Sequence, residues 1–371
     1  MTNLALFAMA AALSTSHPAH GAAKPHTAPP QAPAPYKVPR NAFGQPDMDG
    51  FWTNATLTPE TRPPALGDRA AYTPQEVVEL ESAVVKEVEE GNADIDPNTP
   101  APKVGGEVKP GTRPAFAAAG GAVGGYDRGW LEPGNTVMRV NGVPRTSFLT
   151  TANGQAPLPK SGGAAAPGFG GHGGDARRYS QNYEHRSLGE RCILSFGRNA
   201  GPPMFPNAFY NNNYQFLQTK DAFVIDVEMN HDLRIVRLGG AHRTDGVRPW
   251  MGDSIGRWEG DTLVVETTNI PRQQAYRGAW QHLTVTERFT RVGKDRVHYA
   301  FTINDPTLWD APWGGDYEFA PLKGQIYEYA CHEGNYALPG ILAGARADEA
   351  EAAAAKAAPA TTPAKGKAVG Q

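Results

Sequence analysis

The chain has 371 residues and a formal net charge of -3 at pH 7, and its Lys and Arg residues form no block in the region expected to fold. This pattern argues against a nucleic-acid groove or a patch for anionic membranes, so we predict no nucleic-acid partner. The 42 Gly and 33 Pro residues are concentrated in a few stretches, which leaves enough chain for one large domain with a substantial core.

An apolar run at residues 4–13 has the length of a signal-peptide core and is too short to span a bilayer. Small-x-small patterns at residues 19–21 and 21–23 offer cleavage sites, although no Lys or Arg precedes the run. We predict a signal peptide over residues 1–23, a Pro-rich linker over residues 24–43 and a periplasmic or secreted protein. No later stretch is long and apolar enough for a membrane span.

Cys192 and Cys331 are the only cysteines in the sequence. An exported protein meets an oxidising compartment, which favours a disulfide between them over two free thiols. The bond would close a long loop, and the chain-entropy model assigns such a loop roughly 4–5 kcal/mol of stabilisation.

The first predicted element is a helix that begins after Thr73. The sequence TPQE at residues 73–76 is a capping box with Pro at the first helical position. Apolar residues then recur at helical spacing, and Gly91 ends the pattern. These apolar residues are Val77, Leu80, Val84 and Val88.

Gly/Pro-rich loops are expected at residues 92–125 and 160–175. The second contains a G-x-G-x-x-G pattern from Gly168 to Gly173. The pattern neither leaves a strand nor opens a helix, so it is not a dinucleotide fingerprint, and we predict no cofactor.

Beyond Cys192 the pattern changes to short segments that are rich in β-branched and aromatic residues and are separated by turn residues. Because no helical pattern of crossover length lies between them, we expect a mainly antiparallel sheet. The predicted strands are residues 145–151, 191–196, 214–219, 222–229, 232–238, 261–269, 283–292, 296–303 and 324–331.

Nine short strands joined by tight turns favour a mainly β fold: a single antiparallel barrel or strongly curved sheet of the calycin or lipocalin kind, with one N-terminal helix. We predict one β-rich domain over residues 44–345. The Trp-rich segment at residues 304–319 is interpreted as a flap over the barrel. The tail over residues 346–371 begins with an Ala/Glu run and is predicted to be disordered.

Five segments of the chain resemble an uncharacterised family of exported bacterial proteins. They are GPPMFPNAFYNNNYQFLQT at residues 201–219, EMNHDLRIV at 228–236, WMGDSIGRWEGDTLVVETTNI at 250–270, TERFTRV at 286–292 and YEYACHEGNY at 327–336. The resemblance implies a shared exported single-domain fold over roughly residues 145–346, and it implies no activity. Many relatives carry His where this chain has Thr284, and His282 is the nearby residue that would replace it.

The segment GDSIG around Ser254 matches the G-x-S-x-G pattern of serine hydrolases. A nucleophile elbow needs a strand before the serine and a helix after it, and here a hairpin and a strand follow. The alternative interpretation is that Asp253 and Ser254 cap a tight turn through side-chain to backbone hydrogen bonds.

The segment DVEMNHDLR carries several groups suited to acid–base chemistry. On a regular strand, Glu228, Asp232 and Arg234 would share one face, and His231 would share the other with apolar residues. Asn230 and its neighbours also suit a turn, which would break this facing argument. The charged face either contacts solvent or lines a cavity in which its members pair.

Metal binding would draw on His231, His242, His332 and Glu333, but no H-E-x-x-H, H-x-E-x-H or C-x-x-C spacing occurs. We therefore predict no metal and assign Cys331 to the disulfide. His332 is then available at the rim of the sheet, near a pocket mouth.

The leading functional hypothesis is a small-molecule site for an apolar or aromatic ligand in a cofactor-independent acid–base enzyme, such as a lyase, isomerase or hydratase. Glu228, His231 and His332 are the candidate acid–base residues, and Arg234 is the candidate anion partner. The alternatives are a non-catalytic carrier of an apolar ligand and a structural or interaction protein of the cell envelope. Serine hydrolysis at Ser254 is a fourth hypothesis.

Overall fold

The computed structural model describes residues 36–91, 98, 132, 134–160, 182–195, 198–207 and 210–357. The chain divides into two units, Met1–Lys37 and Val38–Gln371, and every element below belongs to the second. The predicted signal peptide and almost all of both Gly/Pro-rich loops lie outside the described residues. The predicted linker over residues 24–43 ends too late. Val38 is buried, and the second unit begins at this residue.

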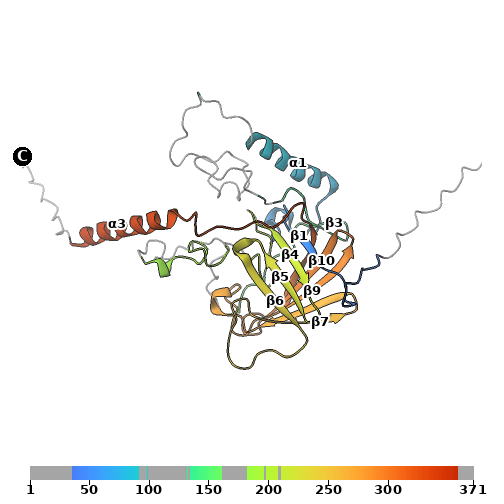
Figure 1. Ribbon diagram of the computed structural model, residues 1–371. Helices are drawn as coiled ribbons and strands as arrows, with labels where there is room; N and C mark the ends of the chain where they lie inside the picture. The colour runs from blue at the N-terminus through green and yellow to red at the C-terminus, as the bar shows by residue number, and fades with distance from the viewer. Residues whose placement is uncertain are drawn as a thin grey trace, which may run out of the picture. The chain divides into compact units, whose positions relative to one another are not determined.

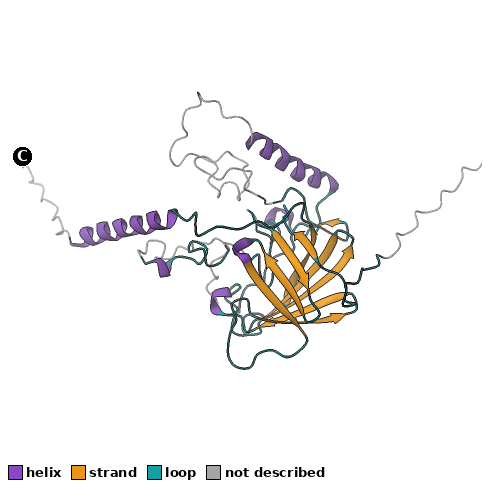
Figure 2. Cartoon of the chain, viewed as in Figure 1, coloured by secondary structure: helices purple, strands orange, loops and turns teal. Residues whose placement is uncertain are grey.

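Nine strands form a closed barrel (Figures 1 and 2). They are β1 (Gly50–Thr53), β4 (Asn213–Gln218), β5 (Ala222–Val227), β6 (Asp232–Leu238), β7 (Asp253–Glu259), β8 (Thr262–Thr268), β9 (Thr284–Gly293), β10 (Arg296–Asn304) and β11 (Trp313–Pro321). A separate hairpin contains β2 (Arg139–Val140) and β3 (Val143–Pro144). The predicted mainly β barrel is confirmed.

The order around the barrel is β1-β11-β10-β9-β8-β7-β6-β5-β4, and β1 closes it by pairing with both β11 and β4. Every neighbouring pair is antiparallel except β6 and β7, which are parallel. The mainly antiparallel sheet expected from the short connections is therefore confirmed.

Three of the predicted strands are wrong. Within residues 145–151 only isolated bridges form, residues 191–195 are turns and bends, and residues 324–330 form no strand. The barrel instead uses β1, β7 and β11. The flap interpretation of residues 304–319 is also wrong where it overlaps β11.

Two glycines in β11 explain why that strand was missed. A Cβ on Gly314 would lie 1.9 Å from the Phe301 carbonyl oxygen, and one on Gly315 would lie 2.1 Å from the Phe148 carbonyl oxygen. These glycines allow the close approach of neighbouring backbone within a sheet, whereas in sequence they are typical of a turn.

The inside of the barrel is filled by the chain's own aromatic rings. Tyr299 and Tyr317 have ring centroids 4.9 Å apart, and Phe216 and Phe223 have centroids 5.3 Å apart. All four side chains are fully buried, as are Phe289 and Phe319. Such a small barrel is filled by side chains and forms a packed core.

The segment at residues 198–207 packs against this aromatic layer. The Met204 N–H donates to the Tyr299 hydroxyl at 2.9 Å, and the Tyr317 hydroxyl donates to the Met204 carbonyl at 3.1 Å. Phe205 stacks on Phe148 with centroids 5.5 Å apart. The barrel core therefore continues into a buried loop.

Helix α1 (Pro74–Gly91) confirms the predicted helix. Its capping box is complete, because the Glu76 N–H donates to the Thr73 hydroxyl at 3.2 Å and the Thr73 N–H donates to the Glu76 carboxylate at 2.8 Å. A further helix, α3 (Ala337–Ala357), was not predicted. It corrects the expectation of disorder for residues 346–357, and residues 358–371 lie outside the described residues.

The predicted disulfide between Cys192 and Cys331 is present, with Cα atoms 5.7 Å apart. It links the turns after residue 182 to the segment that precedes α3. Asn335 adds a hydrogen bond to the Glu190 carbonyl at 2.8 Å. Among the described residues, no helix is long and apolar enough to cross a membrane.

Candidate functional site

The barrel wall opens between β6 and β7. These strands pair only at Arg237 with Ile255 and at Leu238 with Gly256. Continuing the same register would place Ile235 beside Asp253, but the two strands do not pair there. A groove of about 380 Å³ occupies the wedge between them, and we call it the seam groove.

The loop that joins the two strands, residues 239–252, extends from the barrel wall (Figure 1). The described residues that line the seam groove come from β6, this loop and the start of β7. They are Asp232, Leu233, Arg234, Ile235, Arg237, Arg243, Pro249, Trp250, Met251, Gly252, Asp253 and Ser254.

The side chains of β6 alternate clearly between the two faces of the barrel. Arg234 and Val236 are buried and point inward, whereas Leu233 and Ile235 are 51% and 55% exposed. Asp232 shares the inward parity with Arg234 and is half-buried. The charged face of β6 is therefore the inner one.

Arg234 forms a buried ion pair with Glu287 of β9. The Arg234 Nη2 atom lies 2.6 Å from the Glu287 carboxylate, and both side chains are at most 1% exposed. The Tyr299 hydroxyl donates to the second Glu287 oxygen at 2.8 Å. Burial, with a further contribution from Glu287, raises the pKa of Tyr299 well above its ordinary value, so this hydroxyl stays a hydrogen-bond donor.

Asp232 contrasts with that pair. Its carboxyl group forms no side-chain hydrogen bond with any described residue, and its Oδ2 atom is shielded from solvent. Burial raises the pKa of Asp232 from 3.8 to about 7. A carboxyl group with such a pKa, beside a groove, can both accept and donate a proton near neutral pH.

The lining of the seam groove contains both apolar and basic residues. Trp250 is 37% exposed and stands beside Met251. Arg237 pairs with Asp253 at 2.8 Å, and Arg243 pairs with Asp245. The groove thus combines an aromatic surface, cationic groups and one titratable carboxyl group.

His242 connects the 239–252 loop to the barrel strands β7 and β8 through two polar contacts. Its Nδ1 atom lies 3.0 Å from Asp253 Oδ2, and its Nε2 atom lies 3.2 Å from Glu266 Oε1. The Arg243 N–H donates to the same Asp253 oxygen at 2.7 Å. Burial acts to raise the pKa of Asp253, but hydrogen bonds from Arg243, His242 and Arg237 outweigh it and hold this pKa below the ordinary range.

Ser254 lies on strand β7, not at the start of a helix. Its hydroxyl is 2.8 Å from the Thr267 hydroxyl, and its side chain is 3% exposed. The strand–turn–helix geometry of a nucleophile elbow is therefore not formed at this position. The turn-capping interpretation is also corrected, because Asp253 and Ser254 begin a strand, although Asp253 does bind a loop N–H.

Of the four predicted catalytic residues, only Arg234 lines the seam groove. Glu228 is buried elsewhere, where it accepts hydrogen bonds from Asn211 at 2.7 Å and the Tyr327 N–H at 3.0 Å. His231 and His332 are exposed and form no side-chain hydrogen bond with the described residues.

The turn alternative for His231 holds. Residues Met229–His231 form a 3-10 turn, and both Asn230 and His231 have positive φ angles of 62° and 53°. This turn breaks the strand alternation before β6, so the facing argument does not extend from Asp232 back to Glu228. The adjacent Asp232 was noticed in the sequence only as one charge of a face. Its lack of a partner depends on the tertiary structure.

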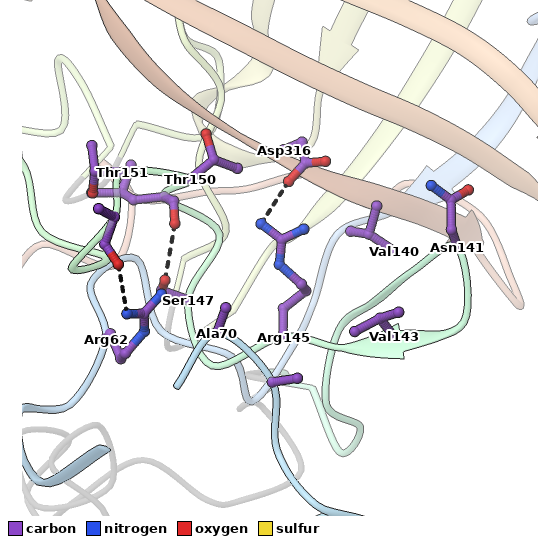
Figure 3. Close-up of a pocket in the computed structure, with 13 residues that line it drawn as sticks. Arg62, Ala70, Val140, Asn141, Val143, Arg145, Ser147, Thr150, Thr151 and Asp316 are labelled. Atoms are coloured by element: carbon purple, nitrogen blue, oxygen red, sulfur yellow. Dashed lines mark hydrogen bonds and ion pairs between the residues drawn. The ribbon is translucent and has the colours of Figure 1, made fainter. Parts of the chain in front are cut away.

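A second groove, of about 470 Å³, lies where the β2–β3 hairpin meets β11 (Figure 3). Arg145 in this groove pairs with Asp316 at 3.0 Å, and His298 lies 3.1 Å from the same carboxylate group. Arg62 donates to the Thr146 hydroxyl at 3.0 Å and to the Ala152 carbonyl at 3.1 Å. These charged groups hold neighbouring loops together, and we assign them a structural role.

Among the described residues, no cluster of three or more His, Cys, Asp or Glu side chains is placed to hold a metal ion. The chain matches no protein-family model, no curated protein and no solved structure. The resemblance to exported bacterial proteins stays a prediction from the sequence segments that carry it.

Proposed function

We propose that the seam groove is a small-molecule site and that the protein is a cofactor-independent acid–base enzyme, of the lyase, isomerase or hydratase type. The observation that carries this proposal is the placement of Asp232 beside a groove: it is half-buried, its Oδ2 atom is shielded from solvent, and its carboxyl group forms no hydrogen bond with any described residue. Unpaired buried carboxyl groups are costly, and they cluster at functional sites.

In this proposal Asp232 takes a proton from the substrate or returns it. Arg234, which also lines the groove, is the donor group of this proposal for an anion formed there. Its ion pair with Glu287 fixes the guanidinium in place, so it requires no reorganisation during the reaction. Trp250 and Met251 supply the contact surface for an apolar or aromatic substrate.

The location and the family belong to the same proposal. We place the protein in the periplasm or outside the cell, and the Cys192–Cys331 disulfide supports an oxidising compartment. Two of the segments that carry the family resemblance, residues 228–236 and 250–270, contribute the two walls of the seam groove.

The carrier hypothesis has less support, because the barrel interior that would hold an apolar ligand is filled by aromatic rings. An interaction role in the cell envelope is the second candidate. It is favoured by exposed aliphatic side chains on β4 and β6, the two strands that flank β5: Leu217 of β4 is 41% exposed, and Leu233 and Ile235 of β6 are more exposed still.

Native mass spectrometry on protein purified from its own compartment, with a denatured mass beside it, tests the site. We expect a bound organic molecule, which Trp250→Ala releases. Protein that carries no organic mass, or a Trp250→Ala variant that retains the molecule, would contradict the groove as its site.

Deuterium exchange tests the chemistry. The extracted molecule is returned to wild-type protein in D₂O, and we expect a carbon-bound hydrogen to exchange for deuterium. Asp232→Asn should slow this exchange by about 100-fold or more, the usual contribution of a general base. Leu217→Asn is the matched control, since Leu217 is an exposed residue of β4 outside the groove, and this variant should exchange at the wild-type rate. Equal rates in the two variants would refute the role of Asp232.

A further inference from the structure

Strand β6 has an unpaired backbone edge along the seam groove. The Leu238 N–H donates to β5 at the Asp221 carbonyl, whereas the Gly239 N–H donates to β7 at the Gly256 carbonyl. Backbone groups alternate in direction along a strand, so those of Leu233 and Ile235 face the seam. Neither residue pairs with β7. Two N–H groups and two carbonyl groups therefore point into the wedge.

Two arginines that contact Asp253, Arg237 through its side chain and Arg243 through its backbone N–H, carry spare cationic donors. Arg237 uses its Nη2 atom for the Ala241 carbonyl and Asp253, and Arg243 uses Nε and Nη2 for Asp245. The other guanidinium donors of both residues form no hydrogen bond with the part of the chain that the structure describes. Their side chains are 47% and 42% exposed, so an anion can reach them.

The apolar surface of Trp250 and Met251 lies in the same groove. Three features therefore occur together: an open strand edge, guanidinium donors with no hydrogen-bond partner among the described residues, and an apolar wall. A free carboxyl terminus of a peptide has the matching groups, namely backbone amides, a carboxylate and a last side chain. Strand addition and capture of a terminal carboxylate are both established modes of peptide recognition.

We propose that the ligand of the seam groove is the carboxyl-terminal end of a peptide, which adds to β6 as a parallel strand. Its terminal carboxylate binds Arg237, at the closed end of the wedge, and the nearby Arg243, and its last side chain, an apolar one, packs against the apolar lining that includes Trp250. This inference rests on the groove that the proposed function identifies as the site, and it names the class of molecule that the groove takes.

The orientation follows from the shape of the wedge. Strand β6 runs from the open end, at Leu233, toward the closed end, at Arg237. A peptide with its carboxylate at the closed end must therefore run in the same direction as β6.

Three acetylated tetrapeptides test the proposal: Thr-Val-Thr followed by Val, Leu or Phe, each with a free carboxylate. The readout is the amide ¹H–¹⁵N shifts of Leu233 and Ile235 in the full chain. We expect at least one peptide to shift both amides and to bind about tenfold more tightly than its C-terminal amide, because a charge-assisted hydrogen bond is lost. N-methylation of the peptide bonds that face β6 should weaken binding by about fivefold per bond.

Variants separate the carboxylate contact from general effects on the fold. Arg237→Gln and Arg243→Gln should remove the preference for the free carboxylate over the amide. Arg257→Gln is the control, because Arg257 is an exposed arginine on β7 that pairs with Glu259 and should leave that preference intact. Equal binding of acid and amide, or no shift of Leu233 and Ile235 by any of the three peptides at millimolar concentration, would overturn the inference.

The outcome is independent of the enzyme proposal. Deuterium exchange of a co-purified molecule without peptide binding contradicts only this inference. Peptide binding without any exchange supports it and contradicts the acid–base role.

Discussion

The barrel interior and the seam groove bury carboxyl groups in opposite ways. Glu287 has an arginine and a tyrosine hydroxyl on its two oxygens and is completely enclosed. Asp232, on the same inner face two positions before Arg234, has no hydrogen-bond partner among the described residues. The fold therefore supplies hydrogen-bond partners to the buried carboxylate of Glu287 and supplies none to Asp232 at the groove.

The strand pairing explains this difference. Glu287 lies on β9, which at this position pairs with both β8 and β10; Tyr299 of β10 and Arg234, from β6, supply its two partners. Asp232 is the first residue of β6. The neighbouring strand β7 pairs with β6 only at the far end, at Arg237 and Leu238, and not beside Asp232. An opening in the wall therefore removes the partners and supplies the space for a ligand at the same place.

The largest expected effect is in the interior. Glu287→Gln leaves Arg234 buried without a counter-charge, and we expect the free energy of unfolding to fall by about 3–5 kcal/mol. Chemical denaturation measures this loss. The double variant Arg234→Met/Glu287→Leu removes both charges and should recover most of it. A single variant as stable as the wild type would mean that the pair is not the buried unit described.

The next effect sharpens the contrast at the groove. From about pH 4 to about pH 7, folded Asp232 holds a proton that the unfolded chain has released, so the free energy of unfolding falls as the pH rises. The full shift corresponds to about 4 kcal/mol, and we expect about 1–3 kcal/mol because the side chain touches groove solvent. Asp232→Asn should remove this slope and be the more stable protein at pH 8.

Denaturant titrations across this pH range measure the slope. Leu233→Asn, which keeps Asp232, should retain the wild-type dependence. If Asp232→Asn also retained it, another group would be responsible, and the contrast between the two carboxyl groups would fail.

The smallest expected change in stability concerns Ser254, which lines the groove and forms a buried hydrogen bond with Thr267. Ser254→Ala should cost about 1 kcal/mol, the net contribution of one such bond. Labelling by a serine-directed phosphonate should be the same in the variant and the wild type, because this hydroxyl lies on a strand. Loss of labelling in Ser254→Ala would restore the hydrolase hypothesis.

Much of the fold could be predicted because its signals are local. The capping box at Thr73 and the alternating segments of β4, β5, β6, β8, β9 and β10 specify their elements through neighbouring residues. The disulfide followed from there being only two cysteines. Residues 324–330 show the limit of local signals: their strand-like composition finds no partner, because β1 already closes the barrel against β11.

The site was harder to predict because it depends on strand pairs and hydrogen-bond partners that do not form. The sequence shows that Asp232 and Arg234 share a face, but it does not show that β7 diverges from β6 after two pairs. Nor does it distinguish Glu228, which three hydrogen bonds hold in place, from a catalytic carboxylate. Partnerless groups are defined by long-range packing, which a local pattern does not contain.

The position of β1 has a consequence for how the chain folds. This strand comes first in the barrel, yet it pairs with β11, the last, through Trp52 and Pro321. The barrel therefore cannot close until nearly all of it has been synthesised, and such non-local pairing makes folding slow. A chain that ended before Trp313 would expose the edges of both β1 and β10, and two open edges favour association between chains over correct closure.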